Sequence, residues 1–477
     1  MSDFDPIIKK ISDYVQNYQA NEESLQEAKT CFFDSIACAF MALEHDQVKK
    51  FIDIDYIKNS QGSVRVVGTD LQTNVLDATF LNGALIRWLD FNDTWLAKEW
   101  GHPSDNLSII LALVDYLKSH RNTSLNFNEV LNYMVMAHEI QGALAIENSL
   151  NKEGLDHVAL VKIASASVGA KMLGHNDHQI KAVISNAFID GQSLRTYRHF
   201  PNTGARKSWA AGDASAKALK QVFISEVSDE SYPTALSAKN WGFNDVLMGE
   251  NPLKLERDLD SYVMDNILYK VSFPAEFHAQ TAAEAAISLS SDVKGKIHDI
   301  KEIKIFTQEP GVRIISKKGP LNNFADRDHC IEYIVAWCLL NGNLNSKSYS
   351  DSSASDENID KLRKLTITLE NQAYTASYYD LGERAIPNKV IVSMKTGEVF
   401  EKEVLYPLGH KKRRAESLPF LKEKFEKSIK KADIREDELM KFYDEKNLDS
   451  INTDSYTHLR AHETSLHLVC RLLLEKK

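Results

Sequence analysis

The feature that most restricts the fold is a long stretch of helical periodicity, from Leu76 to Ile267. Within it, residues 126–147 carry apolar side chains at spacings of three and four, the period of one helix face. Residues 158–173 are rich in alanine and serine, which indicates a tightly packed interior helix. Residues 5–45 predict two earlier helices by the same spacing. The chain is therefore expected to have a mainly α fold.

The pattern changes near Phe273, where extended segments begin to replace helices. Apolar and β-branched runs predict strands at residues 300–306, 312–315, 365–369, 389–394 and 398–405. Residues 395–397 predict a hairpin turn between the last two strands. Helices are expected at residues 274–289 and 330–340, and residues 346–360 are expected to form an exposed, mobile polar loop.

Helical periodicity returns from Glu416 and includes residues 459–474. We therefore expect a large all-α helical domain, made of residues 1–272 and 407–477, with a smaller α+β domain at residues 273–406 inserted into it. A cleft between two such domains is a favoured place for a small ligand.

Composition argues against several functional classes. The net charge is −10, from 57 Lys and Arg against 67 Asp and Glu, which argues against a nucleic-acid-binding protein. No apolar run approaches the roughly 18 residues that span a membrane, and the charged N-terminus lacks a secretory signal, so a cytoplasmic location is expected. No CxxC pair suggests a zinc or iron–sulfur site. The cysteines are expected to be reduced core residues: Cys31, Cys38, Cys330, Cys338 and Cys470.

Residues 85–107 combine core-type apolar positions with many charged side chains, a conflict that concentrates at working sites. If the run up to Trp95 is helical, Asp90 and Thr94 lie one turn apart on one face. His102 follows in the next turn of the chain, and both a carboxylate and an imidazole would then face a helix N-terminus. A capped helix pair with a salt-bridged surface explains the same residues equally well.

Three neighbouring features have structural explanations. Asp93 is expected to cap a helix or to pair with Arg87. One of residues 104–106 is expected to cap a helix that begins near Leu107. His138, inside an apolar helical run, is expected to be a core histidine with satisfied hydrogen bonds.

A basic loop at residues 195–209 is a second candidate site. It leads into a helix, and basic side chains at a helix N-terminus suit carboxylates or phosphates. The glycine spacing is not that of a P-loop. The alternative is a solvated basic loop, although Trp209 brings the segment toward the core. The ionisable basic side chains are Arg195, Arg198, His199, Arg206 and Lys207.

Three shorter stretches add candidates, each with an ordinary alternative. Asp156 would cap the helix that it opens, while His157 is free to point into a cleft. The segment from Lys270 to His278 lies at the junction between the two expected domains. It is either part of a ligand site or an ordinary connector between the domains. Residues 326–329 lie one turn before Tyr333, and either cap its helix or contribute to a site.

Ten blocks of sequence resemble the MmgE/PrpD family, in the family's order. They span residues 85–410 and read RWLDFNDTW, EWGHPSDN, AHEIQG, GLDHV, DGQSLRTYRH, NTGARKSWAAGDA, FPAEFHAQTA, KKGPLNN, ADRDHC and YPLGH. The family includes methylcitrate dehydratases, cis-aconitate decarboxylases and imino-acid epimerases. Residues 99–101, preceding His102, resemble the dehydratase branch.

The resemblance implies a helical domain from both chain ends, with the α+β domain as a lid. It implies dehydration of 2-methylcitrate to 2-methyl-cis-aconitate, in the methylcitrate cycle of propionate catabolism, with side activity on citrate and cis-aconitate. It also implies no cofactor, no metal, a small tricarboxylate as the partner and a homodimer. The alternatives are a cis-aconitate decarboxylase and a non-catalytic tricarboxylate-binding protein.

The resemblance also implies site residues. The catalytic group would be Asp90, His102, His157 and Tyr333. The resemblance gives the substrate-binding group Thr94, Lys207, Lys270 and His278. Because the substrate has three carboxylates, Arg206 and either Arg195 or Arg198 are expected to add further cations to this group. Asp90 would orient or deprotonate His102, which takes the substrate proton, and His157 or Tyr333 would protonate the leaving hydroxyl. The basic side chains would bind the carboxylates and the doubly charged carbanion, and the acid and base could exchange roles.

Overall fold

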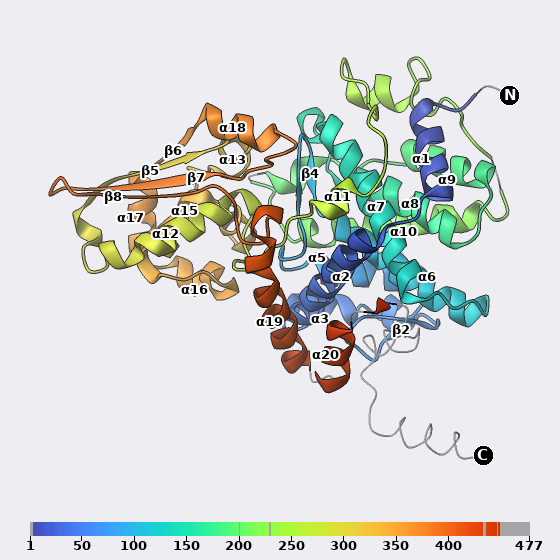
Figure 1. Ribbon diagram of the computed structural model, residues 1–477, viewed down its shortest axis with the longest axis horizontal. Coiled ribbons are helices and arrows are strands. Elements are labelled where there is room, and N and C mark those ends of the chain that lie inside the picture. Colours follow the sequence, from blue (N-terminus) through green and yellow to red (C-terminus); the bar gives the residue numbers. More distant parts are fainter. Residues whose placement is uncertain (1–2, 200, 229, 433–435, 446, 449–477) are drawn as a thin grey trace.

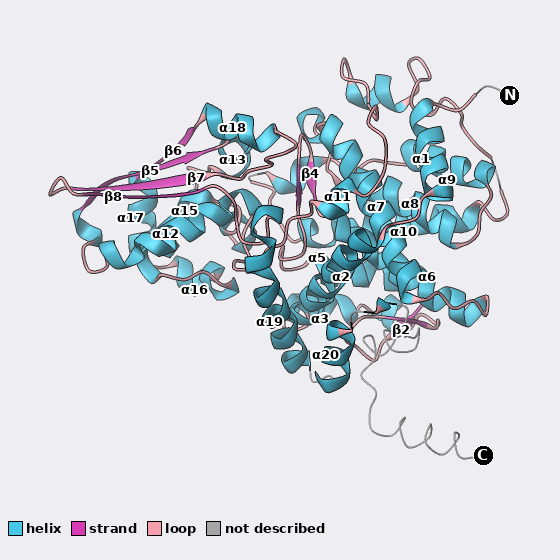
Figure 2. Ribbon diagram, in the orientation of Figure 1, coloured by secondary structure: helices cyan, strands magenta, loops and turns pink. Residues whose placement is uncertain are grey.

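The computed structural model describes residues 3–199, 201–228, 230–432, 436–445 and 447–448. Helices dominate it, and the longer strands gather at one end (Figures 1 and 2). This arrangement confirms the expected mainly α fold. The expected helix at residues 459–474 and Cys470 lie outside the described residues.

The helical region contains most of the helices and two short hairpins. Its helices are α1 (Pro6–Asn17), α2 (Glu22–Ala42), α3 (Asp46–Ile52), α4 (Asp55–Lys58), α5 (Val75–Arg87), α6 (Leu107–His120), α7 (Phe127–Glu147), α8 (Val158–Met172), α9 (Asp177–Ile189), α10 (Arg206–Ile224), α11 (Tyr262–Asp265), α19 (Arg414–Ala432) and α20 (Glu436–Asp444). Its strands are β1 (Val64–Arg65), β2 (Gln72–Thr73), β3 (Trp95–Leu96) and β4 (Trp100–Gly101). The predicted interior helix is α8, which is buried along nearly its whole length.

The α+β region is a four-stranded sheet with helices. Its helices are α12 (Gln280–Val293), α13 (Glu309–Ile315), α14 (Phe324–Arg327), α15 (Ile331–Asn341), α16 (Asp351–Ala354), α17 (Glu357–Leu365) and α18 (Gln372–Tyr379). Its strands are β5 (Ile300–Thr307), β6 (Thr366–Glu370), β7 (Asn388–Met394) and β8 (Val399–Val404), in the order β6-β5-β7-β8. Only the β5–β6 pair is parallel. Buried positions alternate along β5 and β7, so helices such as α12 and α15 cover one face of the sheet (Figure 1).

Three predictions for this region are wrong. Residues 312–315 lie in α13 because Pro310 starts a helix there, and a short β-branched run does not distinguish strand from helix. Residues 346–360 form short helices that Ser350 and Asp356 cap, and Tyr349 is buried among them. The α-helix expected at 274–289 begins only at Gln280, directly after the 3-10 helix Phe277–Ala279.

Buried side chains form two main clusters. The larger runs through the helical region, and the smaller lies between residues 275 and 394. The domain boundaries at 272/273 and 406/407 stay a prediction, which this distribution supports. The two chain crossings lie side by side, because Tyr269 donates its backbone N–H to the Gly409 carbonyl at 3.2 Å. Gly409 has a φ of 92°, and a Cβ there would lie 2.1 Å from the Tyr269 oxygen.

The described cysteines, Cys31, Cys38, Cys330 and Cys338, are buried and free, as expected of core residues. Among the described residues, no helix has both the length and the apolar character needed to cross a membrane.

Helices α5 and α10 approach each other through two glycines. A Cβ on Gly83 would lie 2.5 Å from the Gly212 Cα, and a Cβ on Gly212 would lie 2.4 Å from the Phe80 carbonyl oxygen. Both contacts are with backbone, which has no rotamer to change. The two glycines therefore set the distance between the helix that ends at Arg87 and the helix that begins at Arg206.

We predict that Gly212→Ala lowers the free energy of unfolding by roughly 2 kcal/mol or more, because the added methyl forces the two backbones apart. Thermal unfolding of the variant measures the effect. The control is Gly191→Ala, since an added Cβ at exposed Gly191 meets no described atom within 4 Å. Equal unfolding temperatures for both variants would show that the helix contact is not as tight as described.

Candidate active site

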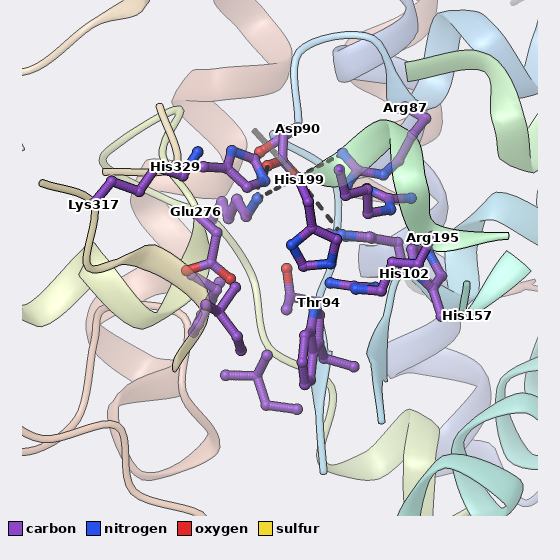
Figure 3. A pocket seen from close by; sticks show the side chains of 16 residues that line it. Arg87, Asp90, Thr94, His102, His157, Arg195, His199, Glu276, Lys317 and His329 are labelled. Atoms are coloured by element: carbon purple, nitrogen blue, oxygen red, sulfur yellow. Dashed lines mark hydrogen bonds and ion pairs between the residues drawn. The ribbon is translucent and has the colours of Figure 1, made fainter. Parts of the chain in front are cut away.

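The pocket that gathers most of the predicted residues has walls from both the helical and the α+β regions (Figure 3). It encloses about 570 Å³, including the part that opens to solvent. Its polar lining is Arg87, Asp90, Thr94, His102, His157, Arg195, Arg198, His199, Lys270, Glu276, Lys317 and His329. Its apolar lining is Leu96, Trp100, Phe277 and Ile314. Arginines and lysines outnumber carboxylates, so the pocket suits a small polyanion.

A hairpin, not a helix, carries the first group of site residues. Helix α5 ends at Arg87, and the chain then turns into β3 and β4, which pair Leu96 with Trp100. The expected helix up to Trp95 is therefore wrong, and Asp90 and Thr94 do not share a helix face. Instead, side chains alternate along the strands: Thr94 and Leu96 line the pocket, while Trp95 points into the core and donates to the Gly142 carbonyl.

Asp90 ends this turn in an unusual backbone conformation. Its φ is 51°, in the left-handed region that Asp tolerates better than most residues. Its Oδ1 accepts hydrogen bonds from Arg87 at 2.5 Å and from Lys270 at 2.7 Å. Burial alone would raise the pKa of Asp90, but Arg87 and Lys270 outweigh it and hold the pKa well below its usual range. Asp90 is therefore a carboxylate that anchors two cations.

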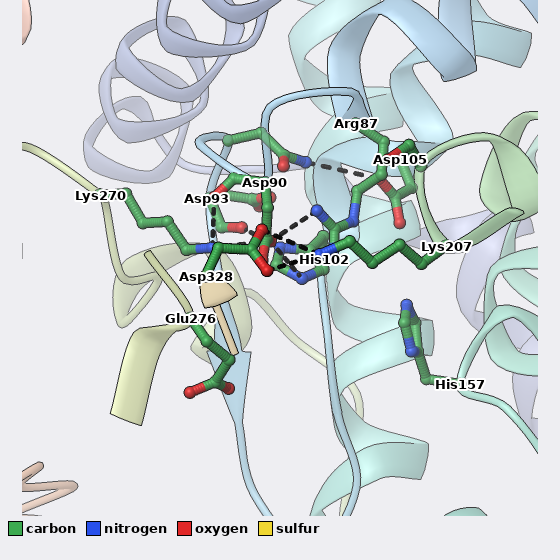
Figure 4. Close-up of polar contacts among 12 residues, drawn as sticks. Arg87, Asp90, Asp93, His102, Asp105, His157, Lys207, Lys270, Glu276 and Asp328 are labelled. Carbon is green, nitrogen blue, oxygen red and sulfur yellow. Dashed lines mark hydrogen bonds and ion pairs between the residues drawn. The ribbon is translucent and has the colours of Figure 1, made fainter. Parts of the chain in front are cut away.

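His102 lines the pocket and lies within the group of polar contacts around Asp90 (Figure 4). Its Nδ1 lies 2.5 Å from the Asp93 carbonyl oxygen, so Nδ1 carries the proton and Nε2 presents its lone pair. Nε2 lies 3.6 Å from Asp90 Oδ1. Burial, together with Arg87, lowers the pKa of His102 well below its usual value. A neutral imidazole with a free Nε2 is equipped to accept a proton.

The side chain of Asp93 fixes the peptide that holds His102. Its Oδ1 accepts the Ser104 hydroxyl at 2.6 Å, and its Oδ2 lies 3.0 Å from His138 Nε2. Asp93 also accepts the Ser104 backbone N–H at 3.1 Å, at the start of the 3-10 helix Pro103–Asn106. It thus satisfies an amide at a helix start, although the N-cap residue of that helix is His102. The alternative pairing with Arg87 is wrong, because Arg87 binds Asp90.

His138 meets hydrogen-bond partners on both ring nitrogens. Its Nδ1 lies 2.8 Å from the Met134 carbonyl oxygen, and its Nε2 faces Asp93. The prediction of a satisfied core histidine is confirmed. The helix after this segment, α6, begins at Leu107, but Asn106 at its N-cap makes no side-chain capping bond. The 3-10 turn before it satisfies the first amides instead, so that part of the capping prediction is wrong.

His157 lies across the pocket, with ring centroids 5.9 Å from His102. Among the described residues, neither of its ring nitrogens has a hydrogen-bond partner, although Nδ1 lies 3.3 Å from Asp156 Oδ1. Burial lowers the pKa of His157 to about 3, and Asp156 opposes this only in part. Asp156 accepts the Val158 N–H at 3.2 Å and also binds Arg198, so it both caps α8 and anchors a pocket arginine.

The α+β region and the crossing into it supply the opposite wall. His329 Nε2 lies 3.7 Å from Asp90 Oδ2, and His329 Nδ1 lies 2.6 Å from Asp328 Oδ1. Glu276 binds His278 at 2.8 Å, and Lys317 completes the cationic lining. Burial lowers the pKa of His329, and Lys207 adds to the effect. The sequence alone did not distinguish a helix cap from a site residue at His329. In the structure, His329 lines the pocket.

Four predicted residues do not line the pocket. Tyr333 lies in the core of the α+β region and donates its hydroxyl to the Ser348 carbonyl at 2.7 Å. Lys207 binds Asp328 at 2.8 Å and lines a neighbouring cavity. Arg206 stacks over Trp209, 4.3 Å from the ring centroid, and His278 is fully buried beside Glu276.

The structure adds pocket residues that were not among the predicted catalytic or substrate-binding residues. These are Arg87, His199, Glu276, Lys317 and His329. Each of them lies in one of the sequence blocks that resemble the MmgE/PrpD family. Charge inside an apolar context was the available signal for Arg87 and Glu276, while nothing in the local spacing indicates which loop side chains turn inward.

Two groups of described residues have the donor types of a metal site: Cys31, Asp93 and His138, and Asp90, Asp328 and His329. In the second group both carboxylates already bind lysine, Asp90 to Lys270 and Asp328 to Lys207. A cation there would have to displace both ammonium groups. The chemistry that the pocket offers directly is binding of carboxylates and transfer of protons by imidazole.

Comparisons with known proteins identify the family of this chain. The model of the MmgE/PrpD N-terminal domain matches residues 9–256, and that of the C-terminal domain matches residues 273–442. A 2-methylcitrate dehydratase of Salmonella typhimurium is 48% identical over 434 residues, covering 89% of this chain and 90% of that protein. The mitochondrial 2-methylcitrate dehydratase of Yarrowia lipolytica is 45% identical over 464 residues, covering 94% and 88%. A 2-methylcitrate dehydratase-like protein of Aspergillus oryzae is 37% identical over 443 residues, covering 89% of each chain. The chain belongs to the MmgE/PrpD family.

Proposed function

We propose that this protein is a 2-methylcitrate dehydratase, which removes water from 2-methylcitrate to give 2-methyl-cis-aconitate. The observation that carries the proposal is the neutral His102, whose free Nε2 faces a pocket rich in arginine and lysine. The names of the relatives support the same reaction. Dehydration of a tricarboxylate needs both a base and cations, and this pocket offers both.

In the proposed reaction, His102 Nε2 accepts the proton from the carbon that carries the methyl group. The electron pair of that C–H bond forms the double bond to the neighbouring carbon, as its C–O bond breaks. The hydroxyl leaves as water after receiving a proton. Negative charge grows on the carboxylate beside the deprotonated carbon, and Lys270 and Arg195 are in position to stabilise it.

We propose His157 as the acid, since it lines the same pocket, 5.9 Å from His102 between ring centroids. Its low pKa arises from burial and from nearby cations such as Arg198. A bound tricarboxylate brings negative charge beside these cations, which raises the proton affinity of His157. Tyr333 is a weaker choice for this role, because its hydroxyl already binds Ser348 outside the pocket.

Weak side activity on citrate follows from the proposed mechanism, since citrate differs only by the missing methyl group. Loss of carbon dioxide from cis-aconitate would instead identify a decarboxylase. The homodimer, the cytoplasmic location and the absence of nucleic-acid partners stay predictions, and one relative carries the word mitochondrial in its name.

We predict that His102→Gln lowers kcat with 2-methylcitrate by about 10²- to 10⁴-fold, because the base is lost. Absorbance of the conjugated double bond in the product measures the rate. The matched control is His298→Gln, at an exposed histidine, which should keep full activity. Citrate should still raise the unfolding temperature of His102→Gln, which separates a lost base from a misfolded pocket. Near-normal turnover by His102→Gln would contradict the assignment.

We predict that Asp93→Asn lowers kcat by about 10- to 100-fold with little change in KM. The substitution removes the charge that faces His138 and loosens the peptide whose carbonyl holds His102, while the cations that bind substrate are untouched. Steady-state kinetics measure both constants. The comparison variant is Asp77→Asn, at a half-buried position in the first turn of α5 that does not line the pocket. A rise in KM at constant kcat would assign Asp93 to substrate binding instead.

We predict that kcat/KM shows no loss of activity as pH falls through about 6.5, the usual pKa of histidine. The base works only when unprotonated, and burial with Arg87 holds the pKa of His102 well below that value, so protonation begins only in more acidic solution. The profile is measured with allowance for ionisation of the substrate. An acidic limb centred near 6.5 would mean that His102 is an ordinary exposed histidine or is not the base.

A further inference from the structure

We propose that four apolar side chains, Leu96, Trp100, Phe277 and Ile314, receive the methyl group of the substrate and determine the preference for 2-methylcitrate over citrate. We call them the apolar wall. This inference rests on the proposed function and adds the residues that would distinguish its two substrates. All four line the same pocket as His102.

The hairpin β3–β4 sets the distance from the apolar wall to the base. Leu96 pairs with Trp100, and Trp95 pairs with Gly101, so Thr94 and His102 come next on either strand. Side chains two residues apart share a face, and a strand rises about 3.3 Å per residue. The apolar pair therefore lies roughly 7 Å along the hairpin from Thr94 and His102, within the length of a small tricarboxylate.

The chemistry of the reaction places the methyl group close to His102 and thus within reach of the apolar wall. The carbon that loses its proton to His102 also carries the methyl group, so the methyl lies one bond from the reacting atom. The substrate's carboxylates are drawn to the arginines and lysines elsewhere in the lining. A carboxylate against the apolar wall would lose hydration without gaining a partner, whereas a methyl group gains by leaving water.

The apolar wall is also backed by packed side chains. Leu96, Trp100 and Phe277 belong to a buried cluster with Leu268, Tyr378 and Ile386, against which Ile314 packs. Two guanidinium groups lie close to the Trp100 ring, that of Arg195 at 4.9 Å and that of Arg313 at 5.3 Å from its centroid. These contacts fix the ring, so the space beside it has a defined shape that one methyl group can fill.

Ile314→Ala tests the inference, because Ile314 is half-buried in α13 and its truncation leaves the packed cluster behind it in place. We expect the ratio of kcat/KM for 2-methylcitrate to kcat/KM for citrate to fall about 3- to 10-fold. The value for citrate should change less than about twofold, since citrate has no methyl group to lose contact. The matched control is Val312→Ala, another half-buried β-branched residue of α13 that is not among the described pocket residues, and its ratio should stay unchanged.

A second substitution at Ile314 adds volume to the same space instead of removing it. Ile314→Phe should fill it, so the variant should discriminate against 2-methylcitrate while it still dehydrates citrate. If both substrates react but neither variant changes the ratio, the apolar wall does not contact the methyl group and this inference is wrong. If the unsubstituted protein dehydrates neither substrate, the proposed function itself is wrong.

Discussion

The geometry of the site depends on one peptide group, that of Asp93. Its carbonyl oxygen binds His102 Nδ1, and its side chain is held by Ser104 and His138 inside the helical core. The carboxylate is fully buried, and a buried carboxylate is stable only when hydrogen bonds satisfy it. The core therefore controls the orientation of the imidazole through the backbone. A substitution that disturbs Asp93 would therefore change the orientation of His102 without altering any other residue that lines the pocket.

The charges that line the pocket affect both substrate binding and the protonation of its histidines. The pocket carries more basic groups than carboxylates, and its histidines are buried among them, so the pKa values of His102, His157 and His329 are all lowered. Burial is the main cause of these lowered pKa values, and nearby cations such as Arg87 and Arg198 add to it at His102 and His157. Asp90 balances part of the charge by binding Arg87 and Lys270, which orders two cations that would otherwise repel each other.

Sequence periodicity predicted the long helices and most strands, because those elements repeat their pattern over several turns or residues. It failed for α13 and for the β3–β4 hairpin, where the segments are too short to show a period. The left-handed backbone of Asp90 ends α5 early, and Asp gives no local signal of that conformation. The pocket residues on the hairpin were found because charge lay in an apolar context.

Placement across the domains was harder to predict. Tyr333 lies four residues after His329, yet only His329 lines the pocket. The side chain of Tyr333 belongs instead to the core of the α+β region. Lys207 was predicted to bind substrate, but its side chain binds Asp328 and lines a neighbouring cavity. Which face of a helix meets another domain depends on contacts between distant segments, and these leave no trace in local spacing.

The paired chain crossings have a mechanical consequence. Tyr269 and Gly409 bind each other where the chain enters and leaves the α+β region, and Lys270 follows immediately. A rigid rotation of the α+β region that kept this hydrogen bond would turn about the double connection. Lys270 would stay close to the axis and keep its contact with Asp90, whereas His329 and Ile314 would swing with the moving body. The half of the pocket that stays in place would thus anchor the substrate, and the half that moves would enclose it.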